Sequence, residues 1–381
     1  MFYIRADGNT KIGMGHVMRC LSVAEAAAEM DCLFPPVFIL ADETCCSLIE
    51  ERGFETIVLH TDYRDMMREL DLLETIFQKE SVSKDNKNSE KKRSNIVLVD
   101  SYQAESTYYL ALSKIVKTVC FEDMGQAYPV DLLINYNLYA PRLDAQYHAI
   151  EAAHQTRDQY PRKVLLGADY MPLRSAFQKP SVYCVAEQVT NVTITTGGSD
   201  PYFATATLVE ALLRDKIIAE QEITLHLVSG PFNQFAAELK RRYQNYEKVS
   251  ANLSALRIQI HEKVKDMRGL LLESDVVLTA TGSTIYEVSA LGVPMIVFYF
   301  AENQRQGAEE LEKLTDIVNA GNIVKEPDRV TERVREALRR CIQDKEYREC
   351  LHRQEKKLID AKGARRIAEQ IRELHNSSNR T

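Results

Sequence analysis

Short apolar runs alternate along this chain with stretches that carry apolar residues at helical spacing. Consecutive apolar residues are typical of buried parallel strands, and apolar residues three and four positions apart are typical of amphipathic helices. The pattern predicts two series of strands, at residues 2–7, 36–41, 55–59, 96–100, 119–123 and 132–137, and then at 192–196, 223–228, 257–261, 275–279 and 295–300. Helices are predicted from His16 onward and at 46–52, 64–78, 203–213, 233–243, 264–273, 285–291 and 328–374.

The two series of strands predict an α/β protein with two domains, residues 1–178 and 179–381, connected through the mixed segment 163–177. A chain of 381 residues is long enough for each half to have its own core. Each series opens with a strand, a glycine turn and a helix, the first unit of a nucleotide-binding domain. We expect two Rossmann-like domains that face a cleft, which is the GT-B architecture of sugar-nucleotide enzymes.

Residues 79–94 depart from this alternation, because the segment KESVSKDNKNSEKKRS is almost wholly polar. Such a composition buries too little apolar surface to order itself. We expect an exposed, mobile insertion in the N-terminal domain.

Composition narrows the class of protein. A net charge of −7 and a pI near 5.8 argue against a nucleic-acid-binding surface. The eight cysteines show neither metal-ligand spacing nor a disulfide framework. The chain enters a strand directly, without a signal peptide, and has no apolar run of membrane length. We therefore expect a cytoplasmic globular protein with no metal, no nucleic-acid partner and no stable membrane insertion.

The loop after the first strand carries the first candidate chemistry. Gly8, Gly13 and Gly15 allow the backbone to approach a phosphate, although the loop matches neither the dinucleotide nor the phosphate-loop pattern. His16 follows in the first turn of the helix, where the dipole disfavours its protonated form. A neutral imidazole there is a candidate general base, and capping or packing is the alternative that residue type alone favours.

Three further strands end in polar residues, at Asp100 with Tyr102, at Glu122–Asp123 and at Asn135 with Asn137. The carboxyl ends of parallel strands line the ligand crevice of a doubly wound sheet. A single polar strand end is commonly a helix cap, but three of them beside the His16 loop favour a site.

These motifs together resemble a family, the UDP-2,4-diacetamido-2,4,6-trideoxy-β-L-altropyranose hydrolases of pseudaminic acid biosynthesis. The segment from Arg5 to Asp7 and the segment 12–21 resemble its N-terminal motif, and the similarity continues in order over the whole chain. The further matches are Asp100 and Tyr102, Asn135 and Asn137, Leu166–Gly167 with Tyr170, Leu173–Arg174 and Phe177, Gly197–Gly198 with Asp200, Gly282–Ser283–Thr284 with Glu287, Asn303–Gln304, and Asp360 with Gly363–Ala364 and Arg366. Glu122 stands where the family often has a second aspartate, which leaves open whether Glu122 or Asp123 faces the sugar.

The resemblance implies hydrolysis of a UDP-linked amino sugar at the anomeric carbon, without a cofactor, and it makes His16 the base that activates water. It implies that helix-start N–H groups stabilise the diphosphate and that Glu287 holds the ribose. The residues that it places in the substrate site are Asp7, Gly13, Gly15, Arg19, Asp100, Tyr102, Asn137, Arg174, Gly197, Gly198, Ser283, Thr284, Glu287, Asn303 and Gln304. For Asn303 and Gln304 helix capping is an equal alternative, and for Arg174 an interdomain salt bridge is one.

Two other functions remain open at this point. The second-domain motif is also similar to that of the lipid-linked sugar transferases of peptidoglycan synthesis, so a GT-B glycosyltransferase with a UDP-sugar donor is the alternative. A catalytically silent nucleotide-sugar-binding protein is the third possibility. The histidine beside a full UDP motif argues against it, because a silent protein has no need of a base.

Overall fold

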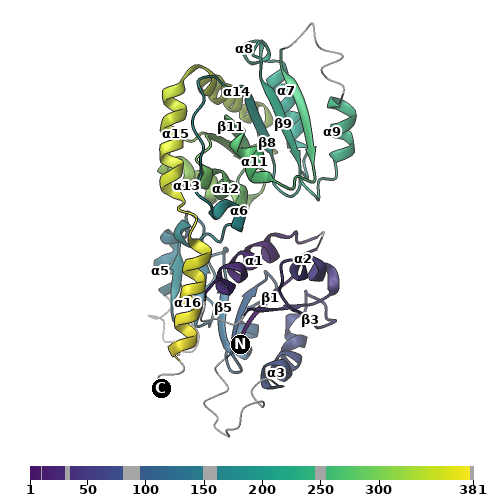
Figure 1. The fold of residues 1–381 in the computed structure, drawn as a ribbon, viewed down its shortest axis with the longest axis vertical. Coiled ribbons are helices and arrows are strands. Elements are labelled where there is room, and N and C mark those ends of the chain that lie inside the picture. Colours follow the sequence, from purple (N-terminus) through teal and green to yellow (C-terminus); the bar gives the residue numbers. More distant parts are fainter. Residues whose placement is uncertain (10, 31–34, 80–94, 149–160, 245–254, 378–381) are drawn as a thin grey trace. The chain divides into compact units, whose positions relative to one another are not determined.

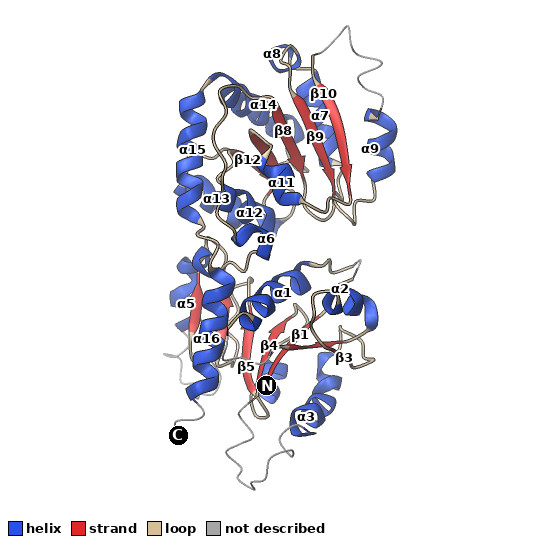
Figure 2. Cartoon of the chain, in the orientation of Figure 1, coloured by secondary structure: helices blue, strands red, loops and turns tan. Residues whose placement is uncertain are grey.

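The computed structural model describes residues 1–9, 11–30, 35–79, 95–148, 161–244 and 255–377, which divide into two compact units. Unit 1 comprises Met1–Ser175 with Ala361–Thr381, and unit 2 comprises Ala176–Asp360. Each unit has a parallel sheet with helices packed against it (Figures 1 and 2). Of the polar insertion predicted at 79–94, all but Lys79 lies outside the described residues. No helix of the described part is long and apolar enough to cross a membrane.

Unit 1 is built on a seven-stranded sheet in the order β3-β2-β1-β4-β5-β6-β7. The five inner strands β2, β1, β4, β5 and β6 are buried on both faces, as their apolar runs predict, and the edge strands β3 and β7 are partly exposed. Its elements are β1 Phe2–Ala6, α1 Gly15–Ala28, β2 Val37–Leu40, η1 Glu43–Cys45, α2 Cys46–Glu50, β3 Thr56–Val58, η2 Met66–Glu69, α3 Leu70–Lys79, β4 Ile96–Asp100, α4 Ser106–Leu112, β5 Lys117–Phe121, β6 Leu132–Asn135, η4 Ala140–Leu143, α5 Asp144–His148, β7 Val164–Leu166, η7 Ala168–Tyr170 and α16 Gly363–Ser377.

Unit 2 repeats this design with a six-stranded sheet in the order β10-β9-β8-β11-β12-β13. The strand order reverses beside the first strand of each unit, between β1 and β4 in unit 1 and between β8 and β11 in unit 2. Its elements are β8 Asn191–Thr195, α7 Ala204–Leu213, α8 Lys216–Ala219, β9 Thr224–Ser229, α9 Ala236–Tyr243, β10 Arg257–Glu262, α11 Met267–Leu272, β11 Val276–Ala280, α12 Ser283–Leu291, β12 Met295–Tyr299, α13 Glu302–Leu314, β13 Asn319–Asn322, α14 Pro327–Gln343 and α15 Lys345–Leu358, after the boundary helix α6 Ser175–Gln178.

The domain division differs from the sequence prediction at the C-terminus. Residues 361–381 belong to unit 1 and not to the second domain, and the boundary at 178 moves to Ser175. The physical reason is the apolar stripe of α16, where Ala364, Ile367, Ala368 and Ile371 are buried and the helix packs along α1 (Figure 1). The single helix predicted at 328–374 is three helices in the structure. The helical conformation is interrupted at Asp344 and again between Leu358 and Gly363.

Candidate functional site

The glycine loop of unit 1 carries the chain from β1 to α1. Its Asn9 side chain accepts hydrogen bonds from the backbone of Lys11 (2.8 Å) and Ile12 (3.1 Å), and the backbones of Asn9 and Gly13 pair with each other. Gly13 has a φ of +76°, which a residue with a Cβ rarely adopts. This tight turn places Gly15 and His16 at the start of α1, beside the point where the strand order of the sheet reverses. That point is the usual ligand site of a doubly wound sheet.

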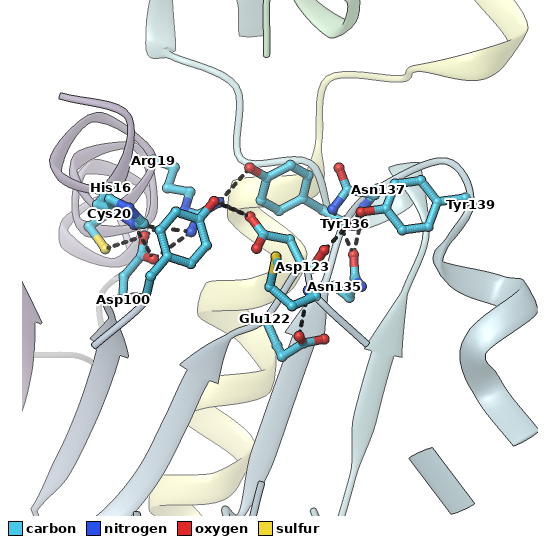
Figure 3. A network of polar contacts seen from close by, with 12 residues as sticks. His16, Arg19, Cys20, Asp100, Glu122, Asp123, Asn135, Tyr136, Asn137 and Tyr139 are labelled. Atoms are coloured by element: carbon cyan, nitrogen blue, oxygen red, sulfur yellow. Dashed lines mark hydrogen bonds and ion pairs between the residues drawn. The ribbon is translucent and has the colours of Figure 1, made fainter. Parts of the chain in front are cut away.

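His16 is held by the carboxylate at the end of β4. Its Nδ1 lies 2.6 Å from Oδ1 of Asp100, and both side chains are almost completely buried (Figure 3). The ring of Tyr102 packs edge-on against the imidazole, with 4.7 Å between the ring centroids. When Nδ1 donates to Asp100, Nε2 is the acceptor. Among the residues that the structure describes, none forms a hydrogen bond with Nε2, so this nitrogen can accept a proton from a bound molecule.

Arg19, one turn further along α1, forms a fork with the same carboxylate. Its Nε lies 2.5 Å from Oδ2 of Asp100 and its Nη2 lies 2.5 Å from Oδ1. Burial opposes the charge on Asp100, but Arg19 and then His16 lower the pKa of this carboxyl well below its ordinary value. Nη1 of Arg19 also donates to the hydroxyl of Tyr136 at 2.6 Å. Asp100 is therefore a charged carboxylate that binds two neighbours on α1.

Asp123 extends this network beyond β5. Its Oδ2 accepts a hydrogen bond of 2.8 Å from the Tyr102 hydroxyl and lies 3.4 Å from Nη1 of Arg19. Burial of the hydroxyl and the Asp123 carboxylate raise the pKa of Tyr102, so this group stays protonated and donates. Tyr102 as a whole residue nevertheless remains 56% exposed. Tyr102 is therefore a member of this network that a ligand can reach from solvent.

Glu122 and Asp123 have different hydrogen-bond partners. This difference bears on the question, left open by the sequence, of which acid faces the sugar. The Glu122 carboxylate accepts from the backbone of Met124 and Gln126 (2.5 and 3.0 Å) and bonds the hydroxyl of Tyr147. It thus holds its own loop, whereas Asp123 joins Arg19 and Tyr102 (Figure 3).

Asn137 is linked to the same part of the sheet. Its Nδ2 donates to Oδ1 of Asn135 at 2.9 Å, and Nδ2 of Asn135 donates to the Tyr147 hydroxyl at 3.0 Å. Asn135 is completely buried and thereby orients the amide of Asn137 at the end of β6 (Figure 3).

Asp7, which the resemblance places in the substrate site, has structural partners here. Its Oδ2 lies 2.5 Å from Nη1 of Arg5, and its Oδ1 accepts from the backbone of Ala41 at 2.8 Å. Arg5 is fully buried and also pairs with the fully buried Glu69. Sequence reasoning missed this pair, although an arginine inside an apolar strand is a signal that a buried acid must exist. Oδ1 of Asp7 therefore links the end of β1 to the residue after β2, while Oδ2 pairs with an arginine of β1 itself.

Unit 2 has its own glycine-lined edge, where β8, β9 and α12 meet. Gly197 has a φ of +83°, and the carbonyl of Gly198 accepts from the backbone of Phe232 at 2.9 Å. A Cβ on Gly230 would lie 2.2 Å from the carbonyl oxygen of Gly197, so this packing requires glycine. Ser283 and Thr284 form the first turn of α12, and a Cβ on Gly197 would lie 3.9 Å from Oγ1 of Thr284. Glycines and helix-start N–H groups thus lie together, as an anion site requires.

The remaining predicted residues occupy different environments. Glu287 is buried in α12, one turn after Ser283. Gln304 caps α13, because its Oε1 accepts from the backbone of Phe300 (3.1 Å) and Ala301 (3.3 Å). Asn303 is exposed in the first turn of that helix, and Arg174 is half-buried just before α6. Within the described parts of the chain, no group of three or more histidine, cysteine or acidic side chains could hold a metal ion.

Comparisons with known proteins found a match to a glycosyltransferase domain and similarity to two curated proteins. Residues 191–371 match the glycosyltransferase family 28 C-terminal domain. The chain is similar to the spore coat polysaccharide biosynthesis protein SpsG of Bacillus subtilis, with 24% identity over 98% of both chains. It is also 26% identical to the uncharacterized protein MJ1062 of Methanocaldococcus jannaschii over 80% of this chain, which spans 56% of that protein.

Solved structures support the architecture of the whole chain. The structure of MurG from Acinetobacter baumannii matches with a TM-score of 0.64 at 12% identity. The match covers 98% of this chain and 99% of the MurG chain. The S. aureus MnaA–UDP co-structure has a TM-score of 0.58 at 12% identity, over 98% of this chain and 96% of that one. The two parallel Rossmann-like sheets therefore have GT-B structural neighbours, and the chain is similar to one protein of polysaccharide biosynthesis.

Proposed function

We propose that this protein is an enzyme that hydrolyses a UDP-linked diacetamido-trideoxy sugar, releasing UDP and the free sugar for nonulosonic (pseudaminic) acid synthesis. The observation that carries the proposal is the 2.6 Å contact between Nδ1 of His16 and Asp100, which leaves Nε2 as an acceptor. A hydrolase needs a base for water, and an imidazole oriented by a carboxylate is suited to that task. The N-terminal resemblance supplies the substrate class.

In the proposed reaction, water attacks the anomeric carbon while Nε2 of His16 takes the water proton. The bond between this carbon and the diphosphate oxygen breaks, and UDP leaves with the electron pair. Asp100 stabilises the imidazolium that forms, because its charge lies against Nδ1. Tyr102, Asp123 and Asn137 present polar groups of unit 1 for the sugar.

Unit 2 is assigned to the nucleotide. The glycines at 197 and 198 and the first turn of α12 supply backbone N–H groups for the diphosphate, and the buried Glu287 would accept the ribose hydroxyls. The match of residues 191–371 to the glycosyltransferase family 28 C-terminal domain and the likeness to a UDP co-structure support this assignment. Neither supports one reaction over the other.

The test is UDP release from a UDP-2,4-diacetamido-2,4,6-trideoxy sugar, with chelator present and no acceptor added. We expect UDP and free sugar to appear in equal amounts. His16→Leu should abolish turnover and leave UDP affinity unchanged, whereas Glu287→Ala should weaken UDP binding. Normal turnover by His16→Leu would remove the base assignment, and unchanged affinity in Glu287→Ala would move the ribose elsewhere.

A glycosyltransferase is the second candidate, because the family 28 match and the fold shared with MurG are as compatible with a transferase as with a hydrolase. Tight UDP binding without UDP release, followed by release once a sugar or lipid acceptor is added, would establish this alternative.

A further inference from the structure

Arg19 is fixed in place by more contacts than a residue waiting for a ligand requires. Its guanidinium lies over the rings of Phe121 and Tyr136, at 5.0 and 5.4 Å from their centroids. It donates to Asp100 with two nitrogens and to the Tyr136 hydroxyl with a third. Cation–π contacts and a forked carboxylate contact together hold the group in place. Arg19 therefore acts on protein groups in this site, and its place among the substrate contacts, which the resemblance implies, stays a prediction.

The same guanidinium lies close to the imidazole. Nη2 of Arg19 is 3.2 Å from Nδ1 of His16, and both nitrogens share Oδ1 of Asp100 (Figure 3). With Arg19 present, a neutral His16, a charged Asp100 and Arg19 sum to zero charge. Without Arg19, the buried carboxylate would have His16 as its remaining cationic partner, and it would favour the imidazolium.

We propose that Arg19 is a positioning residue that neutralises Asp100, so that Asp100 orients His16 without keeping it protonated. This inference rests on the proposed role of His16 as the base. An imidazolium cannot take a proton from water, so neutralising Asp100 favours the form of His16 that can act as a base.

Other groups around His16 do not duplicate this role. The ring faces Asp100 at the end of β4, Tyr102 in the following loop and Arg19 on its own helix. One contact further away lie Cys20, whose Sγ is 3.7 Å from Oδ2 of Asp100, Asp123 and Tyr136. Burial raises the pKa of Cys20 and of Tyr136, so both are neutral, and Arg19 is the single cation of this described set.

The experiment follows the His16 ring by NMR in the intact protein without substrate. Its signal is assigned by its loss in His16→Gln, and its protonation is titrated in wild type, Arg19→Gln and Arg19→Lys. In Arg19→Gln we expect the titration midpoint to rise by about one to three pH units. In Arg19→Lys we expect a smaller rise, because lysine keeps the charge but cannot form the fork. Asp100→Asn should move the midpoint down, because Arg19 then acts on His16 without the carboxylate.

Activity provides the second readout. In Arg19→Gln, the acidic limb of the kcat/KM profile should move to higher pH by the same amount as the NMR midpoint. Arg19→Lys should recover part of the kcat/KM that Arg19→Gln loses at pH 7. UDP affinity should stay at the wild-type value in both variants. Unchanged midpoints in folded Arg19 variants would overturn the inference, and so would an unchanged midpoint in Asp100→Asn if neither Arg19 variant folds. Absence of hydrolysis by wild type would instead overturn the proposed function, since the NMR titration needs no turnover.

Discussion

Gly230 shows how a single missing side chain shapes the edge of unit 2. A Cβ there would lie 2.2 Å from the carbonyl oxygen of Gly197 and 2.5 Å from that of Gly198, and neither backbone atom can move without displacing the turn. We expect Gly230→Ala to lower the free energy of unfolding by about 1–3 kcal/mol, the usual cost of overpacking. UDP binding, measured by calorimetry, should weaken as well, because the displaced turn carries the proposed phosphate contacts.

Gly307→Ala is the matched control in the same unit. Gly307 lies inside α13, where a Cβ would meet no atom within 4 Å. Alanine should therefore raise stability by about 0.5–1 kcal/mol through its helix preference and leave UDP affinity unchanged. Equal UDP affinity in the two variants would contradict the role assigned to the turn of Gly197 and Gly198.

Residue-level prediction from the sequence succeeded where chain position alone determines location. His16 and Asp100 meet because a helix start and a strand end share one edge of a parallel sheet. The partners of single charges were less predictable. Asp7 ends a strand as Asp100 does, but Arg5 and the backbone of Ala41 occupy its oxygens, and Arg5 pairs with Glu69, 64 residues further along the chain. Such pairings depend on side-chain directions that periodicity does not contain.

The bounds of strands with strong apolar runs were predicted closely. Strands that form mainly because a neighbouring strand is in place were not. The strand at 96–100 was predicted with its observed bounds, whereas β13 was missed, because the sequence Asn-Ala-Gly-Asn has low strand propensity. This strand forms on the edge of a sheet whose β12 is already buried. The predicted strand at 119–123 is shifted to Lys117–Phe121, because Glu122 turns back to hold its own loop.

Strands β8, β9 and β10 are linked by a chain of side chains whose strength depends on pH. Nε2 of His226 lies 3.0 Å from Oδ1 of Asn191, and its Nδ1 lies 2.9 Å from Nε2 of His261. Burial lowers the pKa of both histidines. In their neutral forms, His261 can donate to His226, and His226 can donate to Asn191. The unfolded chain binds protons more readily than the folded one, so this contribution to stability is present above the ordinary value of 6.5 and is lost as pH falls through it.

We expect the wild type to lose more stability between pH 8 and pH 5 than His261→Gln, measured by urea unfolding at both values. The variant should be less stable than wild type at pH 8, and the difference should shrink or reverse at pH 5. A constant difference between wild type and His261→Gln would show that the pair does not titrate on unfolding.

The two units do not correspond to two consecutive segments of the sequence. The chain leaves unit 1 after Ser175 and returns to it at Ala361. The returning helix α16 contributes a completely buried Ile371 to unit 1, and Leu338 of α14 is completely buried in unit 2. Deleting a buried aliphatic side chain removes transfer free energy and leaves a cavity, which together cost about 2–5 kcal/mol. The effect of each deletion should be confined to its own unit if the units open separately.

Ile371→Ala should therefore increase amide hydrogen exchange in α1 and β1, more than 340 residues away in sequence, while the exchange of β8 and β11 stays at the wild-type level. Leu338→Ala should have the reverse effect and should weaken UDP binding, whereas Ile371→Ala should not. Hydrogen-exchange mass spectrometry measures both patterns in the intact chain. If Ile371→Ala loosened the strands of unit 2 as much as those of unit 1, the two units would unfold as one cooperative body, and α16 would stabilise unit 2 as well as unit 1.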